Sequence, residues 1–183
     1  FSRDEYSQSG EDGIIEELLR RISLCAKLNK CCVEFGAWDG VHLSNTCNLI
    51  RNAGYHGVLI EGEPKRSAVI ASNFEPGQVS VVEAFVEVGG DNTLDRILRE
   101  LDAPHDFDVL SIDVDGMDYH IFAEMVDHKP KLVCIEFNPT IPNAVSYIQA
   151  RNFDLKHGSS ARAIHQLAEK KGYRVVAATC TNL

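Results

Sequence analysis

The feature that most constrains the fold is a regular alternation of short apolar runs with longer amphipathic stretches. The runs are rich in β-branched residues, as in buried strands, whereas the longer stretches repeat apolar residues at helical spacing. We expect strands at residues 31–35, 57–60, 79–86, 107–114, 132–137 and 173–178, and helices at 11–28, 43–53, 64–73, 93–101, 119–126 and 159–171. This alternation predicts a three-layer α/β/α fold, in which helical crossovers join the strands of a mostly parallel sheet.

Composition narrows the class of protein. We treat residues 1–183 as a single domain whose residues 1–30 form an N-terminal helical cap. The net charge of -9 disfavours a nucleic-acid partner, and no apolar run approaches the ~20 residues that span a membrane. The six cysteines form no CxxC pair, so we interpret them as reduced thiols and expect a cytoplasmic location. The sequence does not indicate an oligomeric state.

Ligands of open parallel sheets bind at the carboxyl ends of the strands, so the residues after each strand matter most. The first strand contains Glu34 and leads into Gly36, Ala37 and Gly40. The glycines allow a sharp turn and close approach of a ligand, and Glu34 can accept hydrogen bonds from loop amides or from a ligand's ammonium group. The turn lacks the GxGxxG pattern that binds a pyrophosphate, which disfavours a nicotinamide-dependent oxidoreductase. An acid followed by glycines in this spacing is instead typical of the first motif that binds S-adenosylmethionine (SAM).

The ends of the next two strands complete the predicted cofactor site. Glu61 ends the second strand, where an acid can hold both ribose hydroxyls of the cofactor. Ala84 and Phe85 end the third strand, on the side expected to face the adenine. Phe85 either stacks on that ring or packs in the core.

The fourth and fifth strands supply the predicted catalytic residues. Asp113 and Asp115 follow the fourth strand, and Glu136 and Asn138 follow the fifth. Asp113, Glu136 and Asn138 offer oxygen ligands that suit Mg²⁺, which would lower the pKa of a substrate hydroxyl. Alternatively, the acids bind only SAM, water or backbone amides. We assign Asp113 to both cofactor binding and catalysis, and we consider His157 a candidate general base beside the substrate opening.

The motifs together resemble the FkbM-type branch of the SAM-dependent methyltransferases. The matching stretches are residues 6–12, 34–40, 60–64, 112–116, 135–139, 158–160 and 171–173. The resemblance implies a Rossmann-like sheet of seven strands, SAM as cofactor, and O-methylation of a small molecule or sugar. It places Glu34, Gly36 and Gly40 in the SAM turn, with Glu61 as the ribose acid and Asp113 as the acid after the fourth strand.

Two departures and several alternatives accompany this resemblance. Trp38 stands where the commoner glycine turn has a small residue, and the last antiparallel strand that the family pattern implies is either cut off or absent. A non-catalytic module with the same fold is the main alternative, and it predicts no turnover. Asp113 to Gly116 also match the DxDG motif of haloacid dehalogenase-type phosphatases, but too few residues follow for that fold. Ser7, Gln8 and Glu11 either close over the ligand or cap the first helix.

Overall fold

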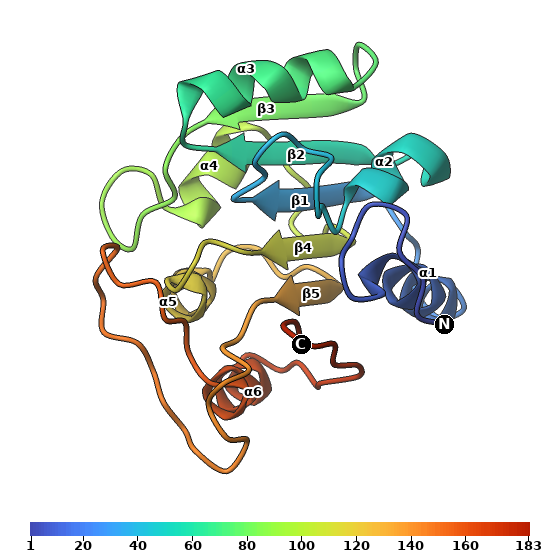
Figure 1. Ribbon diagram of the computed structural model, residues 1–183. Coiled ribbons are helices and arrows are strands. Elements are labelled where there is room, and N and C mark those ends of the chain that lie inside the picture. Colours follow the sequence, from blue (N-terminus) through green and yellow to red (C-terminus); the bar gives the residue numbers. More distant parts are fainter.

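The computed structural model describes residues 1–183 and contains one sheet of five parallel strands in the order β3-β2-β1-β4-β5 (Figure 1). The strands are β1 (Cys31–Phe35), β2 (His56–Glu61), β3 (Val79–Glu83), β4 (Val109–Ile112) and β5 (Leu132–Ile135). The helices are α1 (Glu11–Ile22), α2 (Cys47–Ala53), α3 (Pro64–Asn73), α4 (Leu94–Glu100), α5 (Asp118–Glu124) and α6 (Ala161–Lys170). The strand order reverses between β1 and β4, which is where parallel sheets open a crevice for ligands.

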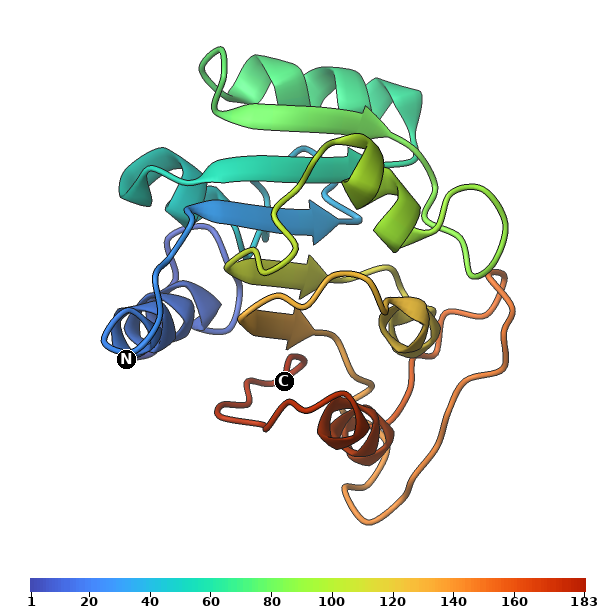
Figure 2. The same cartoon turned by 180° about the vertical axis from the view of Figure 1, so that it is seen from behind.

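Helices cover both faces of the sheet. Alternate residues of a strand point to opposite faces, so Val33 and Phe35 of β1 pack against α4, α5 and α6, whereas Cys32 packs against α1, α2 and α3. Figures 1 and 2 show the two helical layers from opposite sides. The predicted three-layer arrangement is therefore confirmed.

Several elements are shorter than their apolar patterns predict. The third strand ends at Glu83 rather than residue 86, and α1 ends at Ile22 rather than residue 28. The fourth strand begins at Val109 rather than residue 107, and Asp108 directly before it accepts a hydrogen bond from the amide of Lys30 at 2.8 Å.

The predicted sixth strand, at residues 173–178, is wrong. Its β-branched residues Val175 and Val176 remain 41% and 64% exposed, and no strand lies beside them to pair with their backbone. A later segment takes the outer edge of β5 instead. Ile135 and Leu183 exchange backbone hydrogen bonds of 3.1 and 3.0 Å in an antiparallel arrangement. Strand propensity depends on a partner, which a local pattern does not reveal.

The segment before α1 is a structural element. Asp12 accepts hydrogen bonds from the amides of Glu5, Tyr6 and Ser7, and Ser7 Oγ accepts the amide of Asp12 at 3.1 Å. Figure 1 shows α1 beside the amino ends of the strands, away from their arrowheads. These contacts favour the capping interpretation of Ser7 over closure on a ligand.

Glu11 links the start of α1 to the end of the chain. Its Oε1 accepts hydrogen bonds from Thr179 Oγ1 at 2.7 Å and Asn182 Nδ2 at 3.1 Å. Burial opposes the ionisation of Glu11, but the hydrogen bonds from Thr179 and Asn182 outweigh it and lower its pKa. Glu11 therefore holds two distant segments together. None of the helices combines the length and apolar character needed to cross a membrane.

Candidate functional site

The register of the sheet gathers the predicted site residues at one edge. Phe35 is level with Ile60 of β2 and Ile112 of β4, and Ile112 is level with Ile135 of β5. The residues that follow these strands therefore emerge together, at the arrowheads in Figure 1. The carboxyl edge brings together the predicted cofactor and catalytic residues.

The turn after β1 packs tightly against the end of β4. Gly36 has φ +74°, and a Cβ atom at this position would lie 2.0 Å from the carbonyl oxygen of Asp113. Gly40 has φ +77° and faces the ring of Phe74 in the core instead. The amides of Gly36 and Ala37 both donate to the carbonyl of Ile60, at 3.1 and 3.2 Å. Glycine at position 36 is thus required by the backbone of β4, whatever the ligand.

Glu34 is directed into the loop that precedes α2. Its carboxylate accepts hydrogen bonds from Ser44 Oγ at 2.5 Å, Thr46 Oγ1 at 2.7 Å and the amide of Asn45 at 3.0 Å. Burial raises the pKa of this carboxyl group, and these donors oppose the shift. The sequence predicts loop amides or a ligand's ammonium group as partners of Glu34. The structure shows one loop amide, together with two hydroxyl groups.

Glu61 joins the loops that follow β1 and β2. Its Oε2 accepts the amide of Trp38 at 2.9 Å, and its Oε1 accepts the amide of Glu63 at 2.8 Å. A carboxylate oxygen can accept more than one hydrogen bond, so each oxygen retains capacity for a ribose hydroxyl. Glu61 is fixed in position before any ligand binds.

Two predicted residues follow β3. The amide of Ala84 donates to the carbonyl of Glu61 at 3.1 Å. The ring of Phe85 lies so close to Gly62 that a Cβ atom there would be 2.3 Å from the ring. Phe85 is nevertheless 70% exposed. An exposed aromatic ring at this edge has a free surface for stacking.

Three carboxylates gather at the ends of β4 and β5. Oxygen atoms of Asp113, Asp115 and Glu136 lie within 4.8 Å of one another. Burial and the neighbouring Asp113 carboxylate raise the pKa of Glu136 to about 8. Burial, with the charge of Asp115, also raises the pKa of Asp113, and a hydrogen bond links the Asp113 and Glu136 carboxyl groups. Near neutral pH this pair therefore holds a proton, unless a cation replaces it.

Two further groups border these carboxylates. Asp118 accepts the amides of Val114 at 3.0 Å and Gly116 at 2.9 Å, which fixes the turn between β4 and α5. Burial raises the pKa of Asp118 to about 6. On the outer side, Lys156 Nζ lies 3.3 Å from Asp115 Oδ2.

Asn138 and His157 meet each other in a neighbouring loop. Asn138 Nδ2 donates to the carbonyl of His157 at 2.6 Å, and Asn138 Oδ1 accepts from the amide and hydroxyl of Thr140. The side chain of Asn138 is therefore engaged by its own loop, and Asp115 joins Asp113 and Glu136 in the carboxylate cluster. His157 is exposed near this edge.

Gln149 is a site residue that the sequence did not single out. Its Oε1 accepts the amides of His157 and Gly158 at 2.9 and 2.8 Å, and its Nε2 donates to the carbonyl of Leu155 at 2.9 Å. The side chain is fully buried although the loop around it is exposed. Gln149 thereby shapes the segment that carries Lys156 and His157.

The same residue ties this loop to the carboxylate turn. His120 Nε2 of α5 lies 2.6 Å from the carbonyl oxygen of Gln149. The Gln149 amide also packs on Gly116, where a Cβ atom would lie 2.7 Å from it. A glutamine within an irregular loop carries no sequence signal of such burial, and only the fold reveals it.

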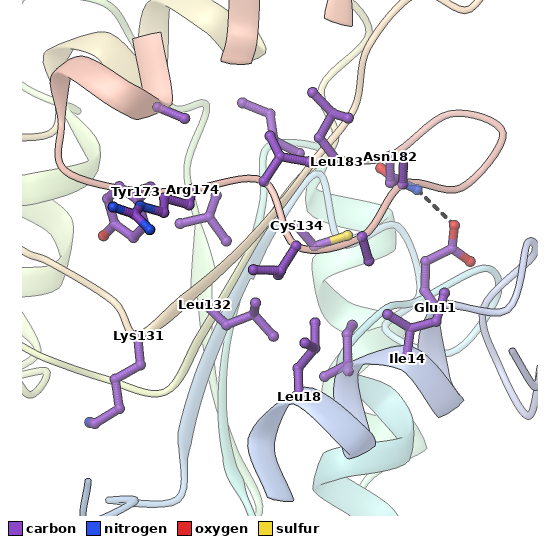
Figure 3. A pocket seen from close by; sticks show the side chains of 18 of the residues that line it. Glu11, Ile14, Leu18, Lys131, Leu132, Cys134, Tyr173, Arg174, Asn182 and Leu183 are labelled. Carbon is purple, nitrogen blue, oxygen red and sulfur yellow. Dashed lines mark hydrogen bonds between the residues drawn. The ribbon is translucent and has the colours of Figure 1, made fainter. Parts of the chain in front are cut away.

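A large apolar groove lies elsewhere. A groove of about 680 Å³ runs between α1, β5 and residues 172–183, and apolar side chains form most of its wall (Figure 3). Figure 3 shows Ile14 and Leu18 of α1 opposite the C-terminal segment, with the Asn182–Glu11 hydrogen bond at one end. None of the predicted cofactor-binding, catalytic or metal-binding residues lines this groove, whereas Glu11, for which the sequence predicts either closure over the ligand or capping of α1, does.

Comparisons with known proteins bear on the family and the fold of the chain. A family model described as the methyltransferase FkbM domain matches residues 90–175, a range that contains Asp113, Glu136 and His157. No curated protein matches the sequence.

Solved structures share the fold at low sequence identity. A candidate sarcosine dimethylglycine methyltransferase from Galdieria sulphuraria has a TM-score of 0.58 and 12% identity, over 91% of this chain and 62% of that one. A candidate O-methyltransferase from Klebsiella pneumoniae has a TM-score of 0.52 and 15% identity, over 93% and 71%. A SAM-dependent methyltransferase from Aquifex aeolicus has a TM-score of 0.51 and 11% identity, over 92% and 85%. The present chain thus spans 62% of the length of the Galdieria protein. These matches confirm the predicted Rossmann-like fold.

Proposed function

Because the family match and the fold support an FkbM-type SAM-dependent methyltransferase, we propose that the protein methylates a hydroxyl oxygen of a small molecule or sugar. The observation that carries the proposal is the cluster of Asp113, Asp115 and Glu136. It follows β4 and β5, within the range that matches the FkbM domain. Glu61 and Phe85 stand on the other half of the same edge, so cofactor and acceptor would meet at the switch point of the sheet.

We assign the cofactor to the half built by β1, β2 and β3. Glu61 holds the ribose hydroxyls, and Phe85 stacks on the adenine beside Ala84. The turn of Gly36, Ala37 and Gly40 bounds the methionine end. Glu34 acts indirectly, because its three hydrogen bonds fix the loop at residues 44–46.

The acceptor hydroxyl must lose a proton as its oxygen attacks the methyl group. Glu136 suits this task in its ionised form: its pKa of about 8 means that it must first release its own proton near neutral pH, but the resulting carboxylate is a stronger base than an ordinary one. Asp113 shares a proton with Glu136 and orients it. His157 is a second candidate base, exposed beside the opening.

The same cluster fits a divalent cation. Three carboxylate oxygens at mutual separations within 4.8 Å form the hard, anionic donor set that Mg²⁺ prefers. Asp113, Asp115 and Glu136 would hold the ion, and Asn138 would join them by releasing Thr140. A bound ion would lower the pKa of the acceptor hydroxyl.

Calorimetric titration with S-adenosylhomocysteine, the product of methyl transfer, tests the cofactor class. We expect binding by the wild type, and a weakening of about 1–3 kcal/mol in Glu61→Gln, the range for a hydrogen bond to a charged group. Glu75→Gln alters an exposed acid away from this edge and serves as the control. Unchanged affinity in Glu61→Gln would contradict the ribose assignment.

Repeating the titration with Mg²⁺ tests the metal. Tighter binding or a separate Mg²⁺ isotherm in the wild type, lost in Asp113→Asn, is the expected result. If Mg²⁺ has no effect in either protein, Asp113 and Glu136 work by proton transfer alone.

A non-catalytic module is the second candidate, favoured by one observation. Glu34 and the amide of Ala37 already have partners within the protein. A folded wild-type chain that binds no S-adenosylhomocysteine would support this candidate.

We also place the enzyme in the cytoplasm, because its six cysteines are all free thiols.

A further inference from the structure

Trp38 has an unusual conformation at the carboxyl edge. It follows β1 and adopts φ +52°, a left-handed conformation that residues with side chains rarely occupy. Its side chain does not enter the core but remains 51% exposed. A large aromatic ring held in a strained turn and exposed to solvent points to a role other than packing.

A closed set of contacts holds this ring beside Glu61. Glu61 accepts the amides of both Trp38 and Glu63. The carboxylate of Glu63 pairs with the guanidinium of Arg66 at 3.0 Å. The guanidinium in turn lies 3.6 Å from the centre of the Trp38 ring. One face of the ring is thus supported by Arg66, and the side chain still has free surface.

We propose that Trp38, supported by Arg66, is a cofactor-contacting residue that forms one wall of the adenosyl site. The inference rests on the proposed function, since it takes Glu61 as the ribose acid. The ring of Phe85 lies against Gly62, directly after Glu61 in the chain, and the amide of Trp38 bonds Glu61 itself, so two residues with exposed aromatic rings contact the Glu61–Glu63 turn. Aromatic walls of this kind bind a purine by stacking, and the cation behind the ring fixes its orientation.

Trp38 is the single tryptophan of the chain, so its fluorescence reports on this site alone. We expect S-adenosylhomocysteine and adenosine to change the emission, and homocysteine to leave it unchanged. Calorimetry on the same samples shows whether the ligand binds at all.

The decisive variant is Trp38→Gly. Glycine relieves the left-handed backbone, which offsets the packing lost with the half-exposed ring, so we expect the variant to remain folded with a stability near that of the wild type. We expect its affinity for S-adenosylhomocysteine to fall about tenfold, as for loss of one stacking partner. A merely structural role would not combine retained stability with weaker binding. Leu43→Gly is the matched control, because Leu43 is also exposed and left-handed in the same loop, and its affinity should not change.

The outcomes separate this inference from the proposed function. If the wild type binds S-adenosylhomocysteine and Trp38→Gly binds it equally well, the role of Trp38 is refuted and the proposed function stands. If the wild type binds no S-adenosylhomocysteine, both are refuted. The inference is supported if Trp38→Gly binds S-adenosylhomocysteine more weakly than the wild type while the Leu43 control variant binds it equally well.

Discussion

Replacing Gly36 by alanine tests how closely the β1 turn must approach β4. The added Cβ atom would lie 2.0 Å from the carbonyl oxygen of Asp113, in a backbone with φ +74°. Gly54, at the end of α2, has a nearly equal φ of +70° but no atom within 4 Å of an added Cβ. Gly54→Ala therefore shares the backbone penalty of Gly36→Ala without the clash.

The magnitudes separate the two variants. A left-handed conformation costs an L-residue about 1–2 kcal/mol, so Gly54→Ala should lower the free energy of unfolding by about that amount. Relieving an overpacked contact costs about a further 1–3 kcal/mol, which brings Gly36→Ala to about 2–5 kcal/mol. The clash is with backbone rather than a flexible side chain, so the turn or β4 must move.

Urea unfolding of both variants and the wild type measures these differences directly. Displacement of Asp113 should also weaken binding of S-adenosylhomocysteine in Gly36→Ala, whereas Gly54→Ala should bind it as the wild type does. Equal losses of stability in the two variants would show that the turn does not press on β4, and the tight packing inferred here would be refuted.

Three further changes probe the site and its supporting loop. The raised pKa of Glu136 means that the native protein binds a proton more tightly than the unfolded chain, so the free energy of unfolding falls as pH rises through about 8. Thermal scans from about pH 5 to pH 9 should show a smaller decline of the melting temperature in Glu136→Gln than in the wild type. Gln149→Met leaves the amides of His157 and Gly158 without an acceptor and should speed their hydrogen exchange, whereas Gln166→Met, which loses one exposed bond to the same loop, should not. Ser160→Ala removes the cap of α6 and should cost about 1 kcal/mol in urea unfolding; full stability in this variant would mean that the cap contributes nothing.

Much of the sheet could be predicted because the β1, β2, β4 and β5 patterns are short, apolar and bounded by turn residues. Because the carboxyl ends of parallel strands lie at one edge of a sheet, the strand predictions alone were enough to place Asp113 and Glu136 at that edge. The two hydroxyl partners of Glu34 and the conformation of Trp38 could not be predicted, since both depend on loops whose paths leave no periodic signal. The prediction of a strand at residues 173–178 was wrong for a related reason, because residues with high β propensity form a strand only where a neighbouring strand can pair with them.

The link between Glu11 and the end of the chain has a consequence for the order of folding. Its bonds to Thr179 and Asn182 join residues 168 and 171 positions apart. Closing a loop of that length in an unstructured chain costs about 4–5 kcal/mol of entropy, so these bonds form only after the sheet has brought the segments near. Within these residues α1 precedes every strand, yet Thr179 and Asn182 follow α6. The start of α1 therefore receives these hydrogen bonds among the last contacts to form, although Ile15 and Leu19 of the same helix pack in the core beside β1.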